Sequence, residues 1–248
     1  MISAMAEAVQ SILPAPPPGA AWQLAWNDEF NGSSVDLRKW TILSGPRAGG
    51  FVTPQNVWLR DGYLHLGVGT QGGKMSTGSL DSRGTTAFRY GYFETRCKLP
   101  LRPGGHRPAF WLTAPSVNAV DVDGRHGTEV DIFEAPARNG HVDINIHWNG
   151  YGPDEHSFHY TVPKPIDYTN FHTYGLWWTP AFYRFYIDGQ LVYQTAAGGV
   201  SQAPESVILT DEVLENDRDA PVNFDMAQSG QVDDFVVDYV RVYNLVGQ

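Results

Sequence analysis

The sequence predicts an all-β domain, a β-sandwich, on three observations. Glycine and proline are abundant, with 26 and 17 copies, and aromatic residues make up 13% of the 248-residue chain against 18% charged residues. Short runs of β-branched and aromatic residues are separated by turn residues, and several runs alternate apolar with polar side chains. This combination is typical of short strands and tight turns rather than long, charged helices. A chain of this length can form one such domain.

Charge and cysteine content exclude several function classes. The formal net charge is −10, which disfavours nucleic acid and anionic membranes because both bind basic surfaces. No run approaches the roughly 18 apolar residues of a transmembrane helix. Cys97 is the only cysteine, so an intramolecular disulfide and a multi-cysteine metal site are excluded. A neutral substrate suits this surface, and we expect no nucleic-acid or membrane partner.

The first 21 residues are expected to form an extension outside the domain. Apolar residues within Met1–Leu13 recur at the spacing of one helix face. Pro14–Ala21, reading PAPPPGAA, is typical of a semi-rigid linker. A signal peptide is not indicated, because no basic residue precedes Arg38 and Glu7 interrupts the apolar stretch. We therefore place the domain at residues 22–248.

Turn residues and alternation predict the strands that follow. The turns are NGSS at 31–34, RDG at 60–62, TQGGK at 70–74 and IDGQ at 187–190. Arg89–Leu99 places Phe93, Cys97 and Leu99 on one face and Tyr92, Glu94 and Arg96 on the other. The first face is predicted to be core, which makes Cys97 a buried structural thiol. The second face is polar and aromatic.

Two later segments show the same period. In the first, Val142, Ile144 and Ile146 oppose Asp143, Asn145 and His147, which predicts a polar concave face. In FVVDYVRVYN at 235–244, Val237, Tyr239 and Arg241 are expected to oppose Val236, Asp238, Val240 and Val242. The length of this last run indicates a central strand.

Three acids lie in the otherwise apolar stretch GTEVDIFEA at 127–135: Glu129, Asp131 and Glu134. Burying carboxylates is costly unless they are solvated in a cleft, hydrogen-bonded or bound to a cation. The acids alone therefore leave catalysis, a cation site and a solvated acidic face open.

A β-bulge would bring the acids together. In a regular strand Glu129 and Asp131 share a face and Glu134 points to the other. One extra residue near Phe133 restores Glu134 to the shared face. The glutamate backbones are then about 13 Å apart, four steps of about 3.3 Å, and side chains that lean together reach the ~5.5 Å of a retaining glycosidase pair. Asp131 between them helps to keep Glu134 protonated while Glu129 is ionised.

The stretch EVDIFE is similar to the E-x-D-x-x-E signature of glycoside hydrolase family 16, the laminarinase, agarase and carrageenase group with a bulged catalytic strand. Other segments follow in the family's order: WNDEFNGSSVDLRKW at 26–40, NVWLRDGYLHL at 56–66, YGYFETRCKLP at 90–100, PAFWL at 108–112, FHTYGLWWTP at 171–180, FYIDGQ at 185–190 and VDYVRVY at 237–243. The resemblance covers residues 22–244.

This resemblance implies a concanavalin-like jelly-roll β-sandwich of two antiparallel sheets with an open concave cleft. It also implies an endo-acting retaining β-glycanase on a β-1,3- or β-1,4-linked glucan or galactan, with no cofactor required for catalysis. Glu129 matches the family's nucleophile, Asp131 its assisting carboxylate and Glu134 its acid/base.

Aromatic candidates for the cleft are Trp111 and Trp178. Trp111 resembles a family tryptophan that stacks on a sugar ring, and the alternative is a core tryptophan between Phe110 and Leu112. Trp178 is a second candidate, although neighbouring residues on a strand face opposite sides, so either Trp177 or Trp178 packs inside.

Polar candidates are His147, Asn145 and Glu94, each on the polar side of its predicted strand. For His147 the alternative is a hydrogen bond with a purely structural role. Glu94 resembles a substrate-contacting position of the family.

The chain also departs from laminarinase-like members of the family. It has Arg107 and His126 where they carry tryptophan, and VTPQN and SVILTDEV where they carry E-L-Q-Y-Y-T and N-L-A-V-G-G. Arg47, Arg107 and His126 are candidates to bind an anionic or galactose-type substituent, the alternative being ordinary exposed residues. These departures favour a galactan over a glucan.

A structural calcium site is common in the family, and Glu29, Gly62 and Asp238 are the matching positions. Oxygen ligands of this kind suit calcium. The alternative for Asp238 is a salt bridge with an arginine such as Arg241.

A non-catalytic lectin of the same jelly-roll shape is the alternative function. A lectin needs aromatic platforms but no opposed carboxylate pair, so the two glutamates favour the enzyme. The resemblance further implies a polysaccharide or oligosaccharide partner and a secreted or periplasmic location, and we expect a monomer.

Overall fold

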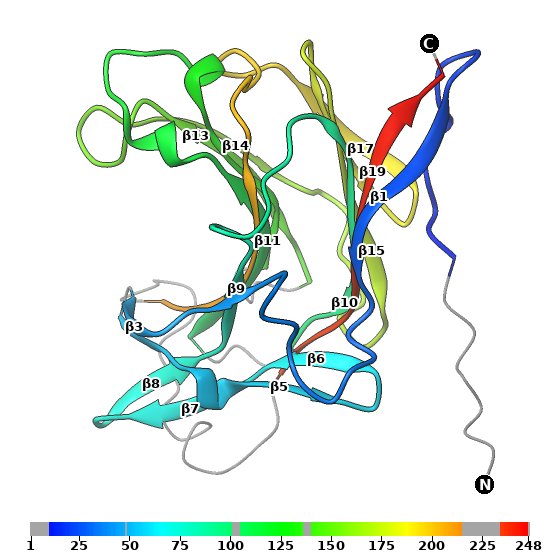
Figure 1. Ribbon diagram of the computed structural model, residues 1–248. Helices are drawn as coiled ribbons and strands as arrows, with labels where there is room; N and C mark the ends of the chain where they lie inside the picture. The colour runs from blue at the N-terminus through cyan, green and yellow to red at the C-terminus, as the bar shows by residue number, and fades with distance from the viewer. Residues whose placement is uncertain (1–9, 48, 101–104, 136–139, 215–233, 248) are drawn as a thin grey trace, which may run out of the picture.

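Two large antiparallel sheets pack face to face (Figure 1). The computed structural model describes residues 10–47, 49–100, 105–135, 140–214 and 234–247. Within these ranges one sheet has eight strands and the other seven. The predicted jelly-roll sandwich is confirmed. None of the helices in the described ranges has the length and apolar character needed to cross a membrane.

The eight-stranded sheet has the order β17-β16-β15-β10-β19-β6-β5, and β1 pairs with the part of β19 beyond β6. Its strands are β1 (Ala21–Asp28), β5 (Val57–Arg60), β6 (Tyr63–Leu66), β10 (Gly91–Lys98), β15 (His172–Trp178), β16 (Tyr183–Ile187), β17 (Gln190–Thr195) and β19 (Phe235–Val246). The central position predicted for the last strand is confirmed. The predicted hairpin turns at 60–62 and 187–190 join β5 to β6 and β16 to β17.

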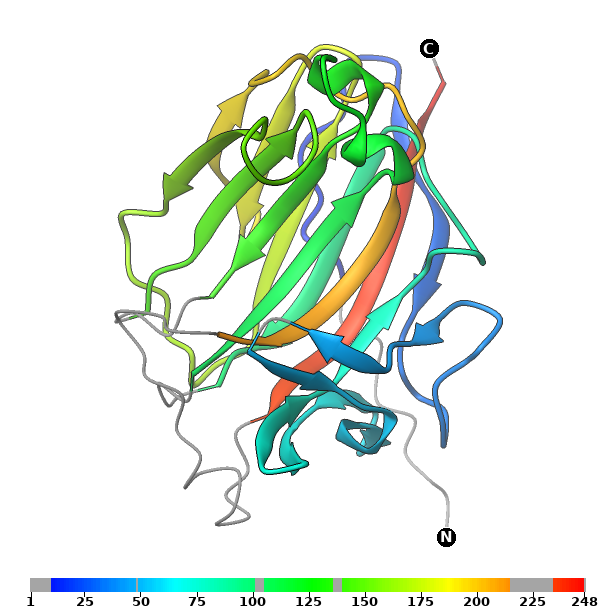
Figure 2. The ribbon, with the colours of Figure 1, turned by 90° about the vertical axis from the view of Figure 1, so that its left-hand side faces the viewer.

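The seven-stranded sheet has the order β14-β13-β12-β11-β18-β9-β2 (Figure 2). Its strands are β2 (Thr41–Ile42), β9 (Ser79–Asp81), β11 (His106–Thr113), β12 (Glu129–Glu134), β13 (Asp143–Trp148), β14 (His156–Thr161) and β18 (Ser206–Val213). The strand with the three acids, β12, lies between β11 and β13. Side chains from both neighbours can therefore surround the acids.

A small third sheet, β3-β4-β8-β7, lies at the lower end of the molecule in Figure 1. It consists of β3 (Gly45–Arg47), β4 (Gly50–Val52), β7 (Val68–Gln71) and β8 (Lys74–Thr77), with the predicted turn at 70–74 joining the last two. Three short 3₁₀ helices complete the described elements: η1 (Pro54–Asn56), η2 (Pro115–Asn118) and η3 (Gly124–His126). Strand β3 ends at Arg47, whose side chain reaches Glu212 on β18 of the seven-stranded sheet.

The core lies between the two large sheets and follows the predicted alternation. Phe93, Cys97 and Leu99 are buried in it, as are Val142, Ile144 and Ile146 from the opposite sheet. The rings of Phe133 and Tyr174 meet across the interface at a centroid distance of 4.2 Å. The buried structural role predicted for Cys97 is confirmed.

The alternation predicted for the last strand is partly wrong. Val237 and Val240 both belong to the core, whereas Tyr239 does not, so the pattern shifts by one residue between them. The pairing with β10 shows the cause, since Cys97 opposes Val237 and Arg96 opposes Tyr239. Asp238 is the extra residue of a bulge, which a strict period of two does not predict.

Part of the N-terminal extension covers the outer face of the eight-stranded sheet. Leu13 packs against an aromatic cluster there, and the Trp22 indole donates a hydrogen bond of 2.7 Å to the carbonyl of Pro14. Most of the predicted N-terminal helix lies outside the described residues, and residues 10–13 are not helical. The division at residue 21 stays a prediction, although β1 begins at that point.

Candidate active site

A bulge in β12 brings the three acids to one face. On the β11 side, Trp111 opposes Asp131 and Phe110 opposes Phe133, which leaves Ile132 as the extra residue. The pairing with β13 shifts by one residue in the same place. The predicted bulge near Phe133 is confirmed. Both Ile132 and Phe133 are buried, so the core holds the irregular backbone in place.

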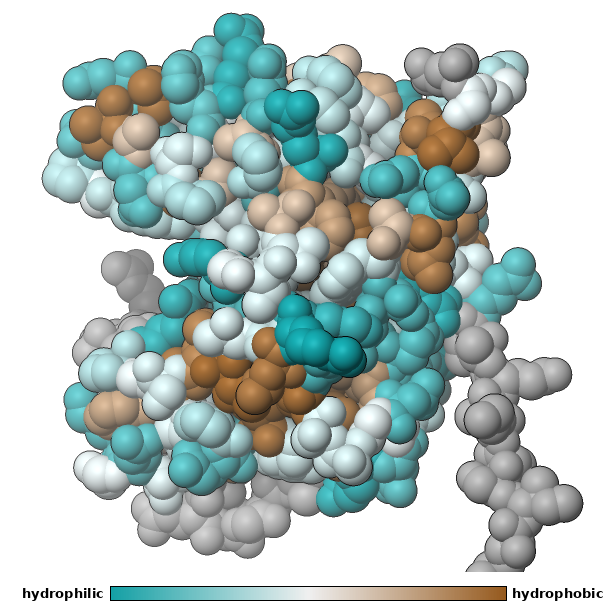
Figure 3. Space-filling model, viewed as in Figure 1, coloured by the Kyte–Doolittle hydropathy of each residue, from teal (hydrophilic) through white to brown (hydrophobic). Residues whose placement is uncertain are grey.

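The acids open into a cleft on the exposed face of the seven-stranded sheet. Glu129, Asp131 and Glu134 line one hollow of about 50 Å³. A larger hollow of about 310 Å³ continues from Glu129 towards η2. The hollow at the three acids is also lined by Arg47, Arg107, Trp111, Thr210 and Glu212. The larger hollow is also lined by Arg83, Asn118 and Tyr151. Figure 3 shows the surface indented on this side, on the left, between the upper loops and the small sheet.

Glu129 is held from the loop after β13. The Tyr151 hydroxyl donates a hydrogen bond of 2.5 Å to Glu129 Oε2. Burial raises the pKa of Glu129 and the charge of Asp131 adds to the rise, while the Tyr151 hydrogen bond and the charge of His147 oppose it. Burial wins, so the carboxyl is a stronger base than a solvated glutamate.

Glu134 is held at both carboxylate oxygens. Arg107 Nε lies 3.1 Å from Oε1, and the Asn145 amide donates to Oε2. The Asn145 oxygen in turn lies 2.6 Å from His159 Nδ1, which fixes the amide. Burial raises the pKa of Glu134, and Asp131 and Glu129 raise it further against the attraction of Arg107. Glu134 therefore keeps its proton to higher pH than a solvated glutamate does.

His147 supports the central acid. Its Nε2 lies 3.5 Å from Asp131 Oδ2, and its Nδ1 lies 2.5 Å from Glu155 Oε1. Burial lowers the pKa of His147, but the hydrogen bonds and charges of Asp131 and Glu155 outweigh it and raise the pKa to about 9. The imidazole is therefore protonated at neutral pH, donates a hydrogen bond to Glu155 and forms an ion pair with Asp131.

Ligand atoms of Glu129, Asp131 and His147 lie within 4.8 Å of one another, the arrangement of a possible metal site. A protonated imidazole has no lone pair for a metal. The pKa of His147 is raised to about 9, so a metal bound here at neutral pH would have to displace the imidazole proton.

Trp111 lies on the cleft face. Its neighbours Phe110 and Leu112 belong to the main core, whereas Trp111 packs with Ala109 and Ile208 on the other side of the sheet. Its indole donates to Thr210 Oγ1 at 3.1 Å, which fixes the ring plane. The core alternative is excluded by this alternation.

Glu212 joins the two arginines of the cleft. Arg47 Nε lies 2.7 Å from Glu212 Oε1 and Arg107 Nη2 lies 3.1 Å from Oε2. The Arg47 guanidinium also lies 5.8 Å from the centre of the Trp111 ring. Two positive groups therefore border the aromatic platform, and one of them also contacts Glu134.

Glu205 forms hydrogen bonds with Thr128, the residue that precedes the acid-bearing strand β12. Its carboxylate accepts a hydrogen bond of 2.8 Å from the Thr128 hydroxyl and one of 3.3 Å from the Thr128 amide. Thr128 directly precedes Glu129. Burial raises the pKa of Glu205 to about 7, with hydrogen bonds from Ser201 and Thr128 opposing the rise.

Glu205→Gln should stabilise the protein at high pH. The folded-state pKa of about 7 exceeds the value of about 4.3 for unfolded glutamate, so this group stabilises the fold below pH ~4 and loses that contribution as the pH rises through 7. Glutamine keeps an acceptor for Thr128 and cannot ionise. We expect an unfolding free energy up to about 4 kcal/mol above wild type at pH ~8 and little difference at pH ~4. Denaturant titrations at the two pH values measure this, and a difference independent of pH would contradict it.

A comparison with known families identifies the chain. The family profile for the glycoside hydrolase family 16 domain of β-porphyranases A–D matches residues 22–245. The chain belongs to glycoside hydrolase family 16. This family assignment confirms the predicted resemblance.

Relatives within family 16 have several names. Glucan endo-1,3-β-glucosidase A1 of Niallia circulans is 28% identical over 93% of this chain and 39% of the relative, and β-porphyranase B of Phocaeicola plebeius is 25% identical over 94% and 88%. The chain spans between 39% and 65% of the length of the first three curated relatives that it matches.

Solved structures show the same fold. One, from work on endo-acting O-glycanases of the human gut microbiota, has a TM-score of 0.75 at 27% identity and covers 94% of both chains. Porphyranase B of Zobellia galactanivorans has a TM-score of 0.76 at 22% identity and covers 93% of this chain and 95% of its own. The jelly roll is thus shared across the family.

Two predicted substrate contacts of this family 16 chain are wrong. Glu94 is 0% exposed and accepts a hydrogen bond from Tyr239 on the outer face of the eight-stranded sheet, away from the cleft. The Glu94 carboxylate itself contacts Ser11 and Ile12 of the N-terminal extension. Trp178 is also 0% exposed and lies in the main core, where its indole donates to the Ser201 carbonyl. Its neighbour Trp177 faces outward under the extension, so neither tryptophan reaches the cleft.

The other predicted contacts differ in position. Arg47, Arg107 and Asn145 surround the acids as described above. His126 lies on η3, with 62% of its side chain exposed and Nδ1 3.4 Å from Asp123 Oδ1. It does not line either of the two hollows at the acids.

The residues matching the family's calcium site do not fit a calcium ion. Glu29 forms a two-point ion pair with Arg241, and Asp238 pairs with Arg96. Gly62 occupies the β5–β6 turn with φ of 82°. Both carboxylates are thus paired with an arginine and not arranged around a calcium ion. The salt bridge that the sequence predicts as the alternative for Asp238 forms with Arg96.

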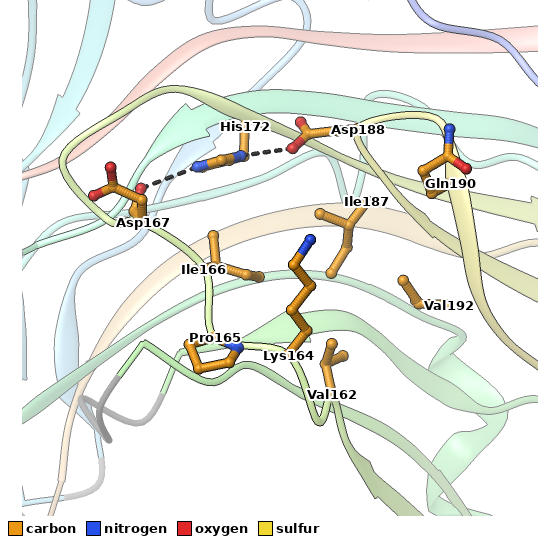
Figure 4. Close-up of a pocket in the computed structure, with 10 residues that line it drawn as sticks. All are labelled: Val162, Lys164, Pro165, Ile166, Asp167, His172, Ile187, Asp188, Gln190 and Val192. Atoms are coloured by element: carbon orange, nitrogen blue, oxygen red, sulfur yellow. Dashed lines mark hydrogen bonds and ion pairs between the residues drawn. The ribbon is translucent and has the colours of Figure 1, made fainter.

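A further hollow of about 260 Å³ lies away from the acids, under the segment between β14 and β15 (Figure 4). His172 hydrogen-bonds there to Asp188 and to the backbone of Asp167. Its walls are otherwise largely aliphatic, including Ile166 and Val192. It contains no pair of carboxylates placed like Glu129 and Glu134.

Several residues at the acids escaped the sequence analysis, namely Tyr151, Glu155, Glu212, Thr210, Arg83 and Asn118. Tyr151 and Glu155 belong to the turn sequence NGYGPDE directly after the polar strand β13. An aromatic residue within a Gly- and Pro-containing loop is the signal that points to such a role.

Proposed function

We propose that the protein is an endo-acting retaining β-glycanase that hydrolyses a β-1,3- or β-1,4-linked polysaccharide by double displacement. The observation that carries this proposal is the bulge, which places Glu129 and Glu134 in one cleft with Asp131 between them. Two neighbouring carboxyls with raised pKa values can act as the acid and the nucleophile of such a reaction. The activities of the family 16 relatives support the same reaction class.

In the first step the Glu129 carboxylate attacks the anomeric carbon and the glycosidic C–O bond breaks. Glu134 donates its proton to the leaving oxygen. In the second step Glu134, now ionised, takes a proton from water, whose oxygen attacks the same carbon and releases Glu129. Both enzyme groups return to their starting protonation states.

The surrounding residues support these proton transfers. Arg107 and Asn145 hold Glu134 in place, and the guanidinium stabilises the carboxylate that remains after the proton has left. Asp131 raises the pKa of Glu134 in the resting enzyme by its negative charge. Protonated His147 fixes Asp131 and keeps that charge in position.

For the substrate we favour a β-galactan, of the agar, carrageenan or host-glycan type, over a β-glucan. Trp111 provides a platform for a sugar ring, and Arg47 and Arg107 border it where an anionic or hydroxyl substituent would lie. The matched family profile is that of porphyranases, and the O-glycanase structure is the more similar of the two in sequence. Glucanases among the relatives keep β-glucan as the second substrate.

A panel of polysaccharides with detection of new reducing ends tests this proposal. Agar, porphyran, carrageenans, laminarin, mixed-linkage glucan and mucin O-glycans should be included. We expect oligosaccharides from at least one galactan-containing substrate. Binding without hydrolysis across the whole panel would instead support the lectin. We also propose that the protein acts as a monomer outside the cytoplasm, which light scattering and localisation of the native protein can check.

The pH optimum of hydrolysis should be higher than the optimum expected for two glutamates with ordinary pKa values. Glu129 must be ionised, so kcat/KM falls as the pH decreases through its raised pKa. Glu134 must be protonated, so kcat/KM falls as the pH increases through its own raised pKa. A profile of kcat/KM from about pH 4 to about pH 9 measures both limbs. A steady decline from pH ~5 upward would contradict the assignment of Glu134 as the acid.

A further inference from the structure

The loop that joins β13 to β14, residues 149–155, is anchored beside the acids. The Gly150 amide donates to the Val117 carbonyl at 2.8 Å, and the Val122 amide donates to Asn149 Oδ1 at 3.0 Å. Asn149 and Gly150 have φ values of 67° and 79°, which turn the chain back towards β12. The loop is therefore tied to the segment that follows β11 and presents its next residue to the cleft.

That next residue is Tyr151, whose hydroxyl lies between two strands. It donates to Glu129 Oε2 at 2.5 Å, and Thr113, the β11 residue that opposes Glu129, lines the same hollow as Tyr151. The residue as a whole is 49% exposed. The hydroxyl end thus contacts the acid while the ring forms part of the wall of the larger hollow.

The same loop reaches the acid cluster a second time. Glu155 binds His147, and His147 contacts Asp131. One loop therefore supports both the carboxyl at the start of the bulged strand and the acid next to it.

We propose that Tyr151 is a positioning residue for Glu129, which it holds by one carboxylate oxygen so that the other is directed to the anomeric carbon. This inference rests on the proposed function. A hydrogen bond to one oxygen limits rotation of the carboxylate and stabilises its ionised form. Burial and the charge of Glu129 raise the pKa of the Tyr151 phenol, so it stays a donor over the range in which the acids titrate.

Tyr151→Phe tests the inference, because it removes the hydroxyl and keeps the ring as a wall of the cleft. We expect kcat to fall about tenfold, the magnitude for one hydrogen bond to a charged group, with KM within about twofold of wild type. The acidic limb of the pH profile should move to higher pH, since the hydrogen bond lowers the pKa of Glu129. Tyr160→Phe is the matched control, because Tyr160 on β14 stacks on Tyr193 of β17 in the opposite sheet and does not line either hollow at the acids. It should leave both kcat and the limb unchanged.

Two other outcomes overturn the inference. Unchanged kcat and an unmoved acidic limb would mean that Tyr151 does not position Glu129. A raised KM with kcat and the limb unchanged would make Tyr151 a substrate contact only. The titration of Glu129 in glutamate-labelled protein, followed by carbon NMR and assigned with Glu129→Gln, gives a readout independent of turnover. A higher pKa in Tyr151→Phe supports the inference even if the wild-type protein cleaves nothing in the panel, a result that would count against the proposed function alone.

Discussion

Glu129→Gln should lower kcat on the preferred polysaccharide by on the order of 10⁴-fold or more, the scale seen when a covalent nucleophile is removed. Glu134→Gln should lower it by about 10²- to 10⁴-fold, the contribution of general acid–base catalysis. Glutamine has the shape of glutamate but can neither attack the anomeric carbon nor donate a carboxylic proton. Both variants should still bind the polysaccharide, because the platform around Trp111 and the two arginines is unchanged. Reducing-end assays and affinity electrophoresis measure the two properties.

Added azide separates the two roles. With an aryl β-glycoside, whose leaving group needs no proton, the first step of a Glu134→Ala variant proceeds and azide captures the glycosyl-enzyme to give a β-glycosyl azide. A Glu129→Ala variant leaves space below the sugar, where azide attacks the substrate itself and gives an α-glycosyl azide. Identical azide products from both variants would contradict the division of roles. Near-normal turnover of either glutamine variant would remove the mechanism altogether.

The strands and the acids could be predicted because each depends on a local pattern. A period of two predicts that Val142, Ile144 and Ile146 are in the core. Glu134 is five residues after Glu129, an odd spacing, so the two side chains share a face only if a bulge near Phe133 adds one residue to the strand. Both inferences use only neighbouring residues and the high free energy of a buried, unpaired carboxylate.

The error at Glu94 has a different cause, because it concerns which sheet a strand joins. Glu94 lies on a polar strand face, as predicted, but β10 belongs to the sheet that faces away from the cleft. Alternating polar and apolar residues are expected both for a strand that lines the cleft and for a strand whose outer face is covered by the N-terminal extension. Only the strand order distinguishes them, and strand order is set by pairing between distant residues.

The alternation of polar and apolar residues does not predict the contacts that Tyr151 and Glu212 make at the acids, for a related reason. Tyr151 reaches Glu129 across 22 positions in sequence, and its approach depends on the left-handed residues Asn149 and Gly150. Glu212 joins Arg47 and Arg107 from β18, which is far from both in sequence. Contacts of this kind follow from the assembled fold and not from any periodicity.

The first product released should be the β anomer, and we expect complete retention of configuration. Direct attack requires the carboxyls of Glu129 and Glu134 to lie about 5 to 5.5 Å apart, and the bulge at Ile132 places both on one face with only Asp131 between them. A separation of ~6.5 to 9.5 Å would instead admit a water between sugar and base and give the α anomer. Proton NMR of the product, read before mutarotation, distinguishes the two.

Methanol as an acceptor provides a check that does not depend on the rate of mutarotation. A glycosyl-enzyme on Glu129 can be intercepted by methanol, with Glu134 taking its proton, so a methyl β-glycoside should form in proportion to the methanol added. An inverting enzyme has no such intermediate and forms no β-glycoside. An α anomer at the earliest time points, together with the absence of methyl β-glycoside, would mean that Glu129 acts as a base on water and that the two carboxyls stand further apart than the bulge implies.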